Sequence, residues 1–129
     1  MRIRINRFFL AALVFIITIQ ESFAQVVITI TSPASGSIIK INTQISVVGN
    51  ITWNPQSDPT PNSALVTILD GGKNVTGSAG CTLGSGAPSI GYTSGQVNTP
   101  KMTTTGFIKV EAFHNGIQIG FIDPTYKFN

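Results

Sequence analysis

Apolar and polar residues alternate along most of this chain, and the alternation is clearest between residues 28 and 53. Residues 26–31 predict one strand of β-branched residues, and residues 44–53 predict a longer one, with a short edge piece at 37–41 before it. A proline- and glycine-containing turn at residues 32–36 separates them. A period of two is typical of a β-strand with one buried face. The stretch therefore predicts the opening strands of an all-β domain.

The longer strand divides its residues between two faces. Its apolar face carries Ile45, Val47, Gly49, Ile51 and Trp53, whereas its polar face carries Ser46, Asn50 and Thr52, and only Val48 interrupts the alternation. A glycine inside a strand indicates a bulge or the close approach of another backbone. We expect the tryptophan in the core, because a β-sandwich commonly buries one large aromatic side chain between its sheets.

The C-terminal third has the same alternating pattern. Strands are predicted at residues 64–69, 106–113, 117–121 and 125–128. Asp70-Gly71-Gly72 indicates a tight turn after the first of these, and Asn115-Gly116 indicates a type I′ hairpin turn, since both residues tolerate a positive φ. Pro124 interrupts the last returning strand. Three prolines mark residues 54–63 as a loop, and helical periodicity appears nowhere after the N-terminal segment.

Residues 76–96 carry six glycines and lie in a stretch with no charged residue between positions 74 and 100. Two interpretations remain open for this region. It forms a long flexible loop with short strands at 89–92 and 96–99, or it forms a specialised binding loop. We favour short strands with mobile connections.

Residues 1–24 have the layout of a secretory signal peptide. Three arginines precede an uncharged apolar run at residues 8–19, and small residues precede a predicted cleavage between Ala24 and Gln25. The alternative is a membrane anchor, but the run is shorter than the roughly 20 residues that span a bilayer. We therefore expect a cleaved signal at 1–24, a single domain at 25–129 and no membrane association after cleavage.

Charge argues against nucleic acid as a partner. The whole chain has a formal net charge of +3, but all its arginines lie in the predicted signal. The remainder keeps five lysines against four carboxylates, a net charge of +1. Nucleic-acid binding needs a cluster of basic residues on one face, which this distribution does not offer. The C-terminus also lacks the apolar tail of a lipid-anchor signal.

Candidate chemistry is sparse. Cys81 and His114 are the only residues that could form a thiol–imidazole pair, and calcium would require Asp58, Asp70 and Asp123 to meet through folding. No zinc-ligand spacing or nucleophile-elbow motif is present. We expect no catalytic residue, metal or cofactor. A lone cysteine cannot form an internal disulfide, so Cys81 is either a free or intermolecular thiol or, as we favour, a small buried residue.

Surface chemistry offers two further candidate sites. Asn50 and Asn74 each begin an Asn-x-Thr sequence, the acceptor for N-glycosylation in organisms that glycosylate exported proteins. Tyr92 and Tyr126 are candidate ligand contacts that could stack on sugar rings. We expect Tyr92 to be the exposed aromatic residue, because it lies in the uncharged, glycine-rich region.

Three segments resemble a known family of modules. ITSPASGSIIKINTQISVVGNI resembles the start of bacterial-type immunoglobulin-like modules, GFIKVEAFHNG their penultimate strand and hairpin, and IDPTYKF their final strand. The match covers both ends of the domain, and residues 54–105 match poorly. A weaker similarity, through Ile51-Thr52-Trp53, is to the N-terminal module of fungal cell-wall assembly proteins, whose Ser/Thr-rich tail is absent. The resemblance implies an immunoglobulin-like, two-sheet antiparallel β-sandwich of about seven strands.

The resemblance also implies a role in adhesion, cell-wall association or spacing, although one fold hosts many functions. We expect a secreted, non-catalytic module that contacts an extracellular polysaccharide or a surface protein, outside the cell or at its wall. The alternative is a carbohydrate-binding protein that uses Tyr92 and the segment from Gly77 to Gly95.

Overall fold

The computed structural model describes residues 26–129, which form strands and connecting turns without a helix. The predicted signal peptide and its cleavage position at Ala24 and Gln25 lie outside the described residues. Among residues 26–129, no helix has the length and hydropathy that crossing a membrane requires. The all-β prediction is confirmed for this part of the chain.

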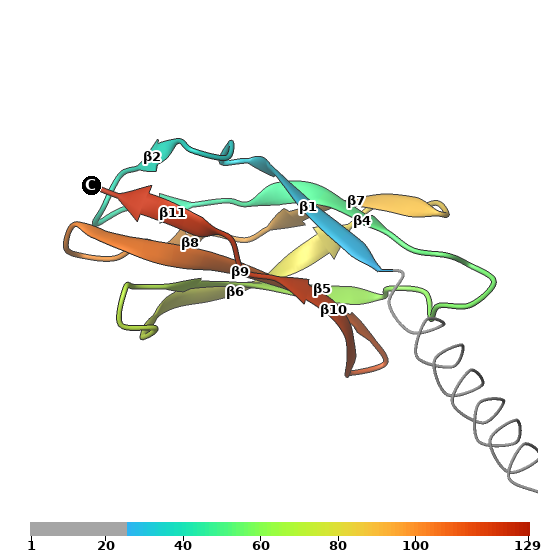
Figure 1. Ribbon diagram of the computed structural model, residues 1–129. Helices are drawn as coiled ribbons and strands as arrows, with labels where there is room; N and C mark the ends of the chain where they lie inside the picture. Colours follow the sequence, from blue (N-terminus) through green and yellow to red (C-terminus); the bar gives the residue numbers. More distant parts are fainter. Residues whose placement is uncertain (1–25) are drawn as a thin grey trace, which may run out of the picture.

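The described residues, 26–129, contain eleven strands (Figure 1). They are β1 (Val27–Ser32), β2 (Ile38–Ile39), β3 (Gln44–Ile45), β4 (Val48–Thr52), β5 (Ser63–Leu69), β6 (Val75–Leu83), β7 (Ser89–Ser94), β8 (Val97–Asn98), β9 (Thr104–His114), β10 (Ile117–Ile122) and β11 (Thr125–Phe128). The resemblance implied about seven strands. The larger number arises because the strand expected at 44–53 is divided into β3 and β4, because β6 forms where a loop was expected, and because the short β2 and β8 count as strands of their own.

Nine strands form one curled sheet, hydrogen-bonded in the order β1-β4-β7-β6-β5-β9-β11-β2, with β10 also paired to β9. β3 and β8 form a separate two-stranded sheet. The curl places β1, β4 and β7 opposite β5 and β9, as Figure 1 shows. All pairings are antiparallel except that of β2 with β11, so the expectation of a wholly antiparallel fold is wrong at this edge.

β6 holds the curled sheet together. Its first part, up to Gly80, pairs with β5, whereas Cys81 to Leu83 pair with β7. One strand thus belongs to both halves of the sheet. The expected loop at residues 76–96 is therefore wrong over residues 76–83, while the short strands expected at 89–92 and 96–99 correspond to β7 and β8.

Gly77 of β6 is required by packing, because another strand lies against it. A side chain at Gly77 would lie 2.5 Å from the backbone nitrogen of Asn98, because β8 passes directly over β6. Because glycine has no side chain, the two strands can cross here. Intrinsic propensity alone would have indicated a flexible segment.

The predicted strand at residues 44–53 is divided into two strands, β3 and β4. β3 pairs with β8, and β4 pairs with both β1 and β7. At the junction, the Ser94 hydroxyl accepts a hydrogen bond from the Val47 nitrogen at 2.8 Å, and the Ser46 hydroxyl donates to the Ser94 carbonyl at 2.6 Å. The predicted faces are confirmed, since Val47, Ile51 and Trp53 are buried.

The C-terminal hairpin agrees with the sequence. Asn115 and Gly116 both have a positive φ, at 50° and 81°, and they connect β9 to β10. β10 and β11 pair in succession with the same edge of β9, so they form the predicted returning strand, which is interrupted between Ile122 and Thr125.

The core lies inside the curl. Its fully buried members are contributed by both halves of the sheet, and include Ile51 and Tyr92 from one half and Val66, Ile108 and Val110 from the other. Because no disulfide is present in the described residues, this core supplies most of the stability of the fold.

Candidate functional site

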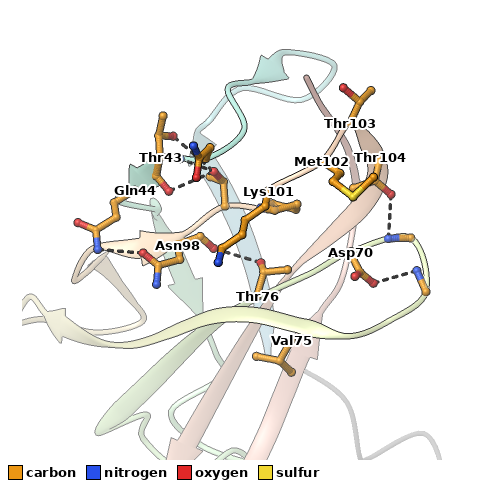
Figure 2. A pocket seen from close by; sticks show the side chains of 15 residues that line it. Thr43, Gln44, Asp70, Val75, Thr76, Asn98, Lys101, Met102, Thr103 and Thr104 are labelled. Carbon is orange, nitrogen blue, oxygen red and sulfur yellow. Dashed lines mark hydrogen bonds between the residues drawn. The ribbon is translucent and has the colours of Figure 1, made fainter.

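A polar hollow of about 810 Å³ opens where three segments meet at one end of the fold (Figure 2). The segments are residues 42–44 before and within β3, the β5–β6 turn with the start of β6, and residues 98–104 between β8 and β9. Its lining is rich in threonine and amide side chains. Ligand sites are commonly concave with a few placed polar groups, so this hollow is the candidate binding site.

One wall of the hollow is the turn that begins at Asp70. The Asp70 Oδ1 atom accepts hydrogen bonds from the backbone nitrogens of Gly72 and Asn74, each at 2.9 Å. The backbone N–H of Asn74, its side chain and the N–H of Gly72 lower the pKa of the Asp70 carboxyl, against an opposing effect of desolvation. The Gly71 nitrogen donates to Thr104 Oγ1 at 3.0 Å and ties the turn to β9. Asp70 therefore shapes the wall as an ionised structural residue.

The opposite wall is a ladder of polar side chains between β3 and β8. The Gln44 amide nitrogen donates to the Asn98 amide oxygen at 2.9 Å, and the Thr43 nitrogen donates to Thr99 Oγ1 at 3.0 Å. The Thr76 hydroxyl donates to the Asn98 carbonyl at 3.1 Å. The Gln44 amide oxygen and the Asn98 amide nitrogen take no part in this bond, so they offer an acceptor and a donor side by side.

The rim combines apolar and cationic side chains. Val75 and Met102 are 63% and 78% exposed, and Figure 2 shows Lys101 extending over the hollow between the two walls. Lys101 forms no ion pair with any residue of the described part of the chain. No aromatic side chain lines the hollow.

The fold keeps apart the three aspartates that were considered as calcium ligands. Asp58 accepts a hydrogen bond from the Asn54 nitrogen at 2.9 Å in its own loop, Asp70 lies in the β5–β6 turn, and Asp123 lies between β10 and β11. No group of three or more potential metal ligands gathers within residues 26–129. The calcium arrangement considered from sequence is therefore not formed.

The fold also separates Cys81 from His114. Cys81 lies on β6 and His114 ends β9, with β5 between these strands in the sheet. Two strand spacings amount to about 9.5 Å, which is too far for a hydrogen bond. The His114 Nδ1 atom instead lies 2.7 Å from the Thr60 carbonyl oxygen. The two residues do not form a thiol–imidazole pair.

The favoured interpretation of Cys81 agrees with its surroundings. The side chain is partly buried and packs against the core, and desolvation raises the pKa of its thiol to about 11. We predict that it reacts slowly with a thiol reagent in the folded state at pH 8, because only about one thiol in a thousand is ionised. Absorbance with a disulfide reagent should show full reaction only after unfolding, and a rate equal to that of free cysteine would contradict the burial.

The candidate ligand contacts Tyr92 and Tyr126 are structural. Tyr92 is 1% exposed and its hydroxyl donates to the Thr29 carbonyl at 2.9 Å, so the expectation of an exposed Tyr92 is wrong. The pKa of Tyr92 is raised, mainly because the hydroxyl is desolvated and to a smaller extent because the ionisable groups of Cys81 and Tyr126 are near it. Tyr126 is 4% exposed and donates to the Pro33 carbonyl at 2.9 Å. The proposed sugar platform of Tyr92 and the segment from Gly77 to Gly95 is therefore not formed.

Trp53 is buried at 3% exposure, as predicted, although its indole nitrogen has no hydrogen-bond partner within residues 26–129. Both glycosylation candidates are exposed. Asn50 lies on the outer face of β4, and Asn74 lies in the β5–β6 turn, where its amide nitrogen is 3.3 Å from Asp70 Oδ1. A glycan on Asn74 would therefore stand beside the hollow.

Sequence reasoning missed the residues that line the hollow. The one local signal was the run of threonines and Lys101-Met102 at residues 99–105, which is polar yet flanked by strands. Gln44 and Asn98 were 54 positions apart and carried no visible signal of their pairing. The sequence matches no protein-family model and no curated protein.

Proposed function

We propose that this chain is an exported, non-catalytic immunoglobulin-like module that binds an extracellular polysaccharide in the polar hollow. The observation that carries the proposal is the hollow itself, with the free acceptor of Gln44 beside the free donor of Asn98. Export is supported by the arginine-led apolar segment and small residues of positions 1–24.

The strand order supports the immunoglobulin-like assignment. In that fold, strands A, B, E and D form one sheet and strands C, F and G the other. With β1, β4, β5, β6, β7 and β9 taken as A to F and the β10–β11 strand as G, the observed neighbours are β1-β4-β7-β6 and β5-β9-β10/β11. The continuity of the curled sheet arises because β6 pairs with β5 as well as β7.

The chemistry of the hollow suits a hydroxyl-rich, neutral ligand. A pair of adjacent sugar hydroxyls can donate to the Gln44 oxygen and accept from the Asn98 nitrogen, while Lys101 donates a further hydrogen bond. Met102, which is 78% exposed at the rim, provides apolar surface for the C–H face of a sugar ring. Without an aromatic platform, we expect each saccharide unit to contribute modestly, so that tight binding requires a repeating polymer.

The number of carboxylates in the hollow supports binding without catalysis. Hydrolysis of a glycosidic bond generally uses two carboxyl groups about 5–10 Å apart. The hollow contains Asp70, whose oxygens accept hydrogen bonds within the turn, and no second carboxylate lines it. Binding without cleavage is therefore the activity that these groups favour.

Retention on insoluble polysaccharides tests the proposal. We expect the purified protein to sediment with at least one of chitin, β-glucan and cellulose, and Asn98→Ala to weaken binding about tenfold, because it removes the donor and releases Gln44. Asn50→Ala is the matched control, since it removes an exposed asparagine outside the hollow. Failure of the unmodified protein to bind any of the three polymers, or equal loss in both variants, would reject this assignment.

A further inference from the structure

The outer face of the sheet around β9 carries more apolar side chains than a solvent-facing sheet requires. On β9, Ile108, Val110 and Ala112 are buried, so the alternation of a strand directs Phe107, Lys109, Glu111 and Phe113 outward. On β5, the same alternation directs Leu65, Thr67 and Leu69 outward. We call the outward side chains of β5, β6, β9 and β10 the β9 face.

Cross-strand pairing gathers these side chains into two apolar groups. Phe107 lies opposite Leu69, which in turn lies opposite Val75. The second group surrounds Glu111, which lies on β9 between Leu65 of β5 and Phe121 of β10. Phe113 is the next outward residue of β9 after Glu111. Val75 is 63% exposed and Phe121 is 55% exposed. Solvent thus contacts large apolar side chains at both ends of this face.

Opposite charges lie between the apolar groups. Lys109 Nζ is 3.9 Å from Glu111 Oε1, and it lies 5.5 Å from the centre of the Phe121 ring. Glu111 also accepts a hydrogen bond from the Gln118 amide nitrogen at 3.2 Å. The two charges are adjacent along β9, with Val110 between them on the opposite side of the strand.

We propose that the β9 face binds a second copy of this chain in a two-fold symmetric dimer. A two-fold axis that lies between the two faces, perpendicular to β9 and level with Val110, brings Lys109 opposite the partner's Glu111, and Glu111 opposite the partner's Lys109. The same rotation brings Phe107 against the partner's Phe113. A symmetric interface requires a self-complementary surface, and the order apolar, cation, anion, apolar along β9 has that property.

The size of the face agrees with such an interface. The four strands contain 7, 9, 11 and 6 residues, and at about 3.3 Å by 4.8 Å per residue they cover roughly 500 Å². The smaller specific interfaces bury up to about 600 Å² on each partner, so the face suits a dimer of moderate affinity. Of the residues that line the polar hollow, the β9 face includes only Val75, so the dimer leaves the hollow open and does not depend on the proposed ligand.

Sedimentation equilibrium on the exported protein tests this dimer. We expect a dimer at micromolar concentrations, with Lys109→Glu and Glu111→Lys each weakening association about 30-fold or more, because each places like charges together twice in the symmetric interface. The double variant carrying both reversals should recover affinity to within about threefold of the original protein. Lys40→Glu, at an exposed lysine outside the face, should have no effect.

Two results would overturn the proposal. One is a monomer at every concentration up to about 0.5 mM, well above the dissociation constants of specific interfaces. The other is a dimer whose association does not respond to charge as proposed. This would be seen if the single reversals left the affinity unchanged, or if the double variant associated no more tightly than the single variants. Phe107→Ser offers an independent variant that should also weaken association, and unchanged thermal unfolding of the monomeric variants shows that the fold is intact.

Discussion

Replacing Gly49 with alanine is expected to lower the free energy of unfolding by about 3 kcal/mol, a large part of the stability of a domain this size. A Cβ at this position would overlap the Thr29 carbonyl oxygen and would lie 2.6 Å from the Tyr92 hydroxyl oxygen. The carbonyl belongs to the backbone of β1, so the clash cannot be relieved by rotating a side chain. β1 and β4 must therefore separate, and the Tyr92 hydroxyl must also shift from its buried acceptor.

Urea denaturation followed by tryptophan fluorescence measures this effect, since Trp53 is buried one residue beyond β4. Gly80→Ala is the matched control, because it also lies inside a strand but a Cβ there meets nothing within 4 Å. We expect the control to change the midpoint little. If Gly49→Ala were as stable as Gly80→Ala, the close packing of Tyr92 against β4 would be wrong.

Ile51→Ala is expected to cost about 3–4 kcal/mol, the second large effect. Ile51 is fully buried and lies between Ile28 on β1 and Ile90 on β7, which are both buried beside it. Truncation leaves a cavity in the middle of this isoleucine row. Neither neighbouring strand can move inward to fill the cavity, because each is fixed to β4 by backbone hydrogen bonds.

The same denaturation experiment compares this variant with Ile38→Ala. Ile38 is an isoleucine in a short strand and is 65% exposed, so its truncation should cost well under 1 kcal/mol. A similar loss in both variants would mean that the isoleucine row does not carry the core of this half of the sheet.

The alternation of apolar residues was sufficient to predict the strands that have one wet face. β9 and the Asn115-Gly116 turn follow directly from pattern and turn chemistry, because a hairpin with a type I′ turn is specified locally. β6 could not be predicted this way. Gly77 is required by β8, which crosses β6 there, and that contact depends on Asn98, about twenty positions away.

The candidate site was harder to predict than the fold. Tyr92 illustrates the reason, since its uncharged, glycine-rich neighbours suggested an exposed loop. The glycine that mattered was Gly49, far away in sequence, which makes room for the tyrosine hydroxyl. The hollow is likewise assembled from three distant segments whose polar residues are unremarkable when each is considered alone. Spatial convergence of separate loops leaves no periodic signal in a sequence.

The division of β6 between two neighbours has a consequence for how the protein opens. A strand that bonds to β5 through one part and to β7 through the other links the backbone amides on both sides of the core. Opening either side disturbs the same strand, so the slowest-exchanging amides of β4 and β9 should share one opening free energy in native-state hydrogen exchange. β6 thereby makes the two sides of the core a single cooperative unit.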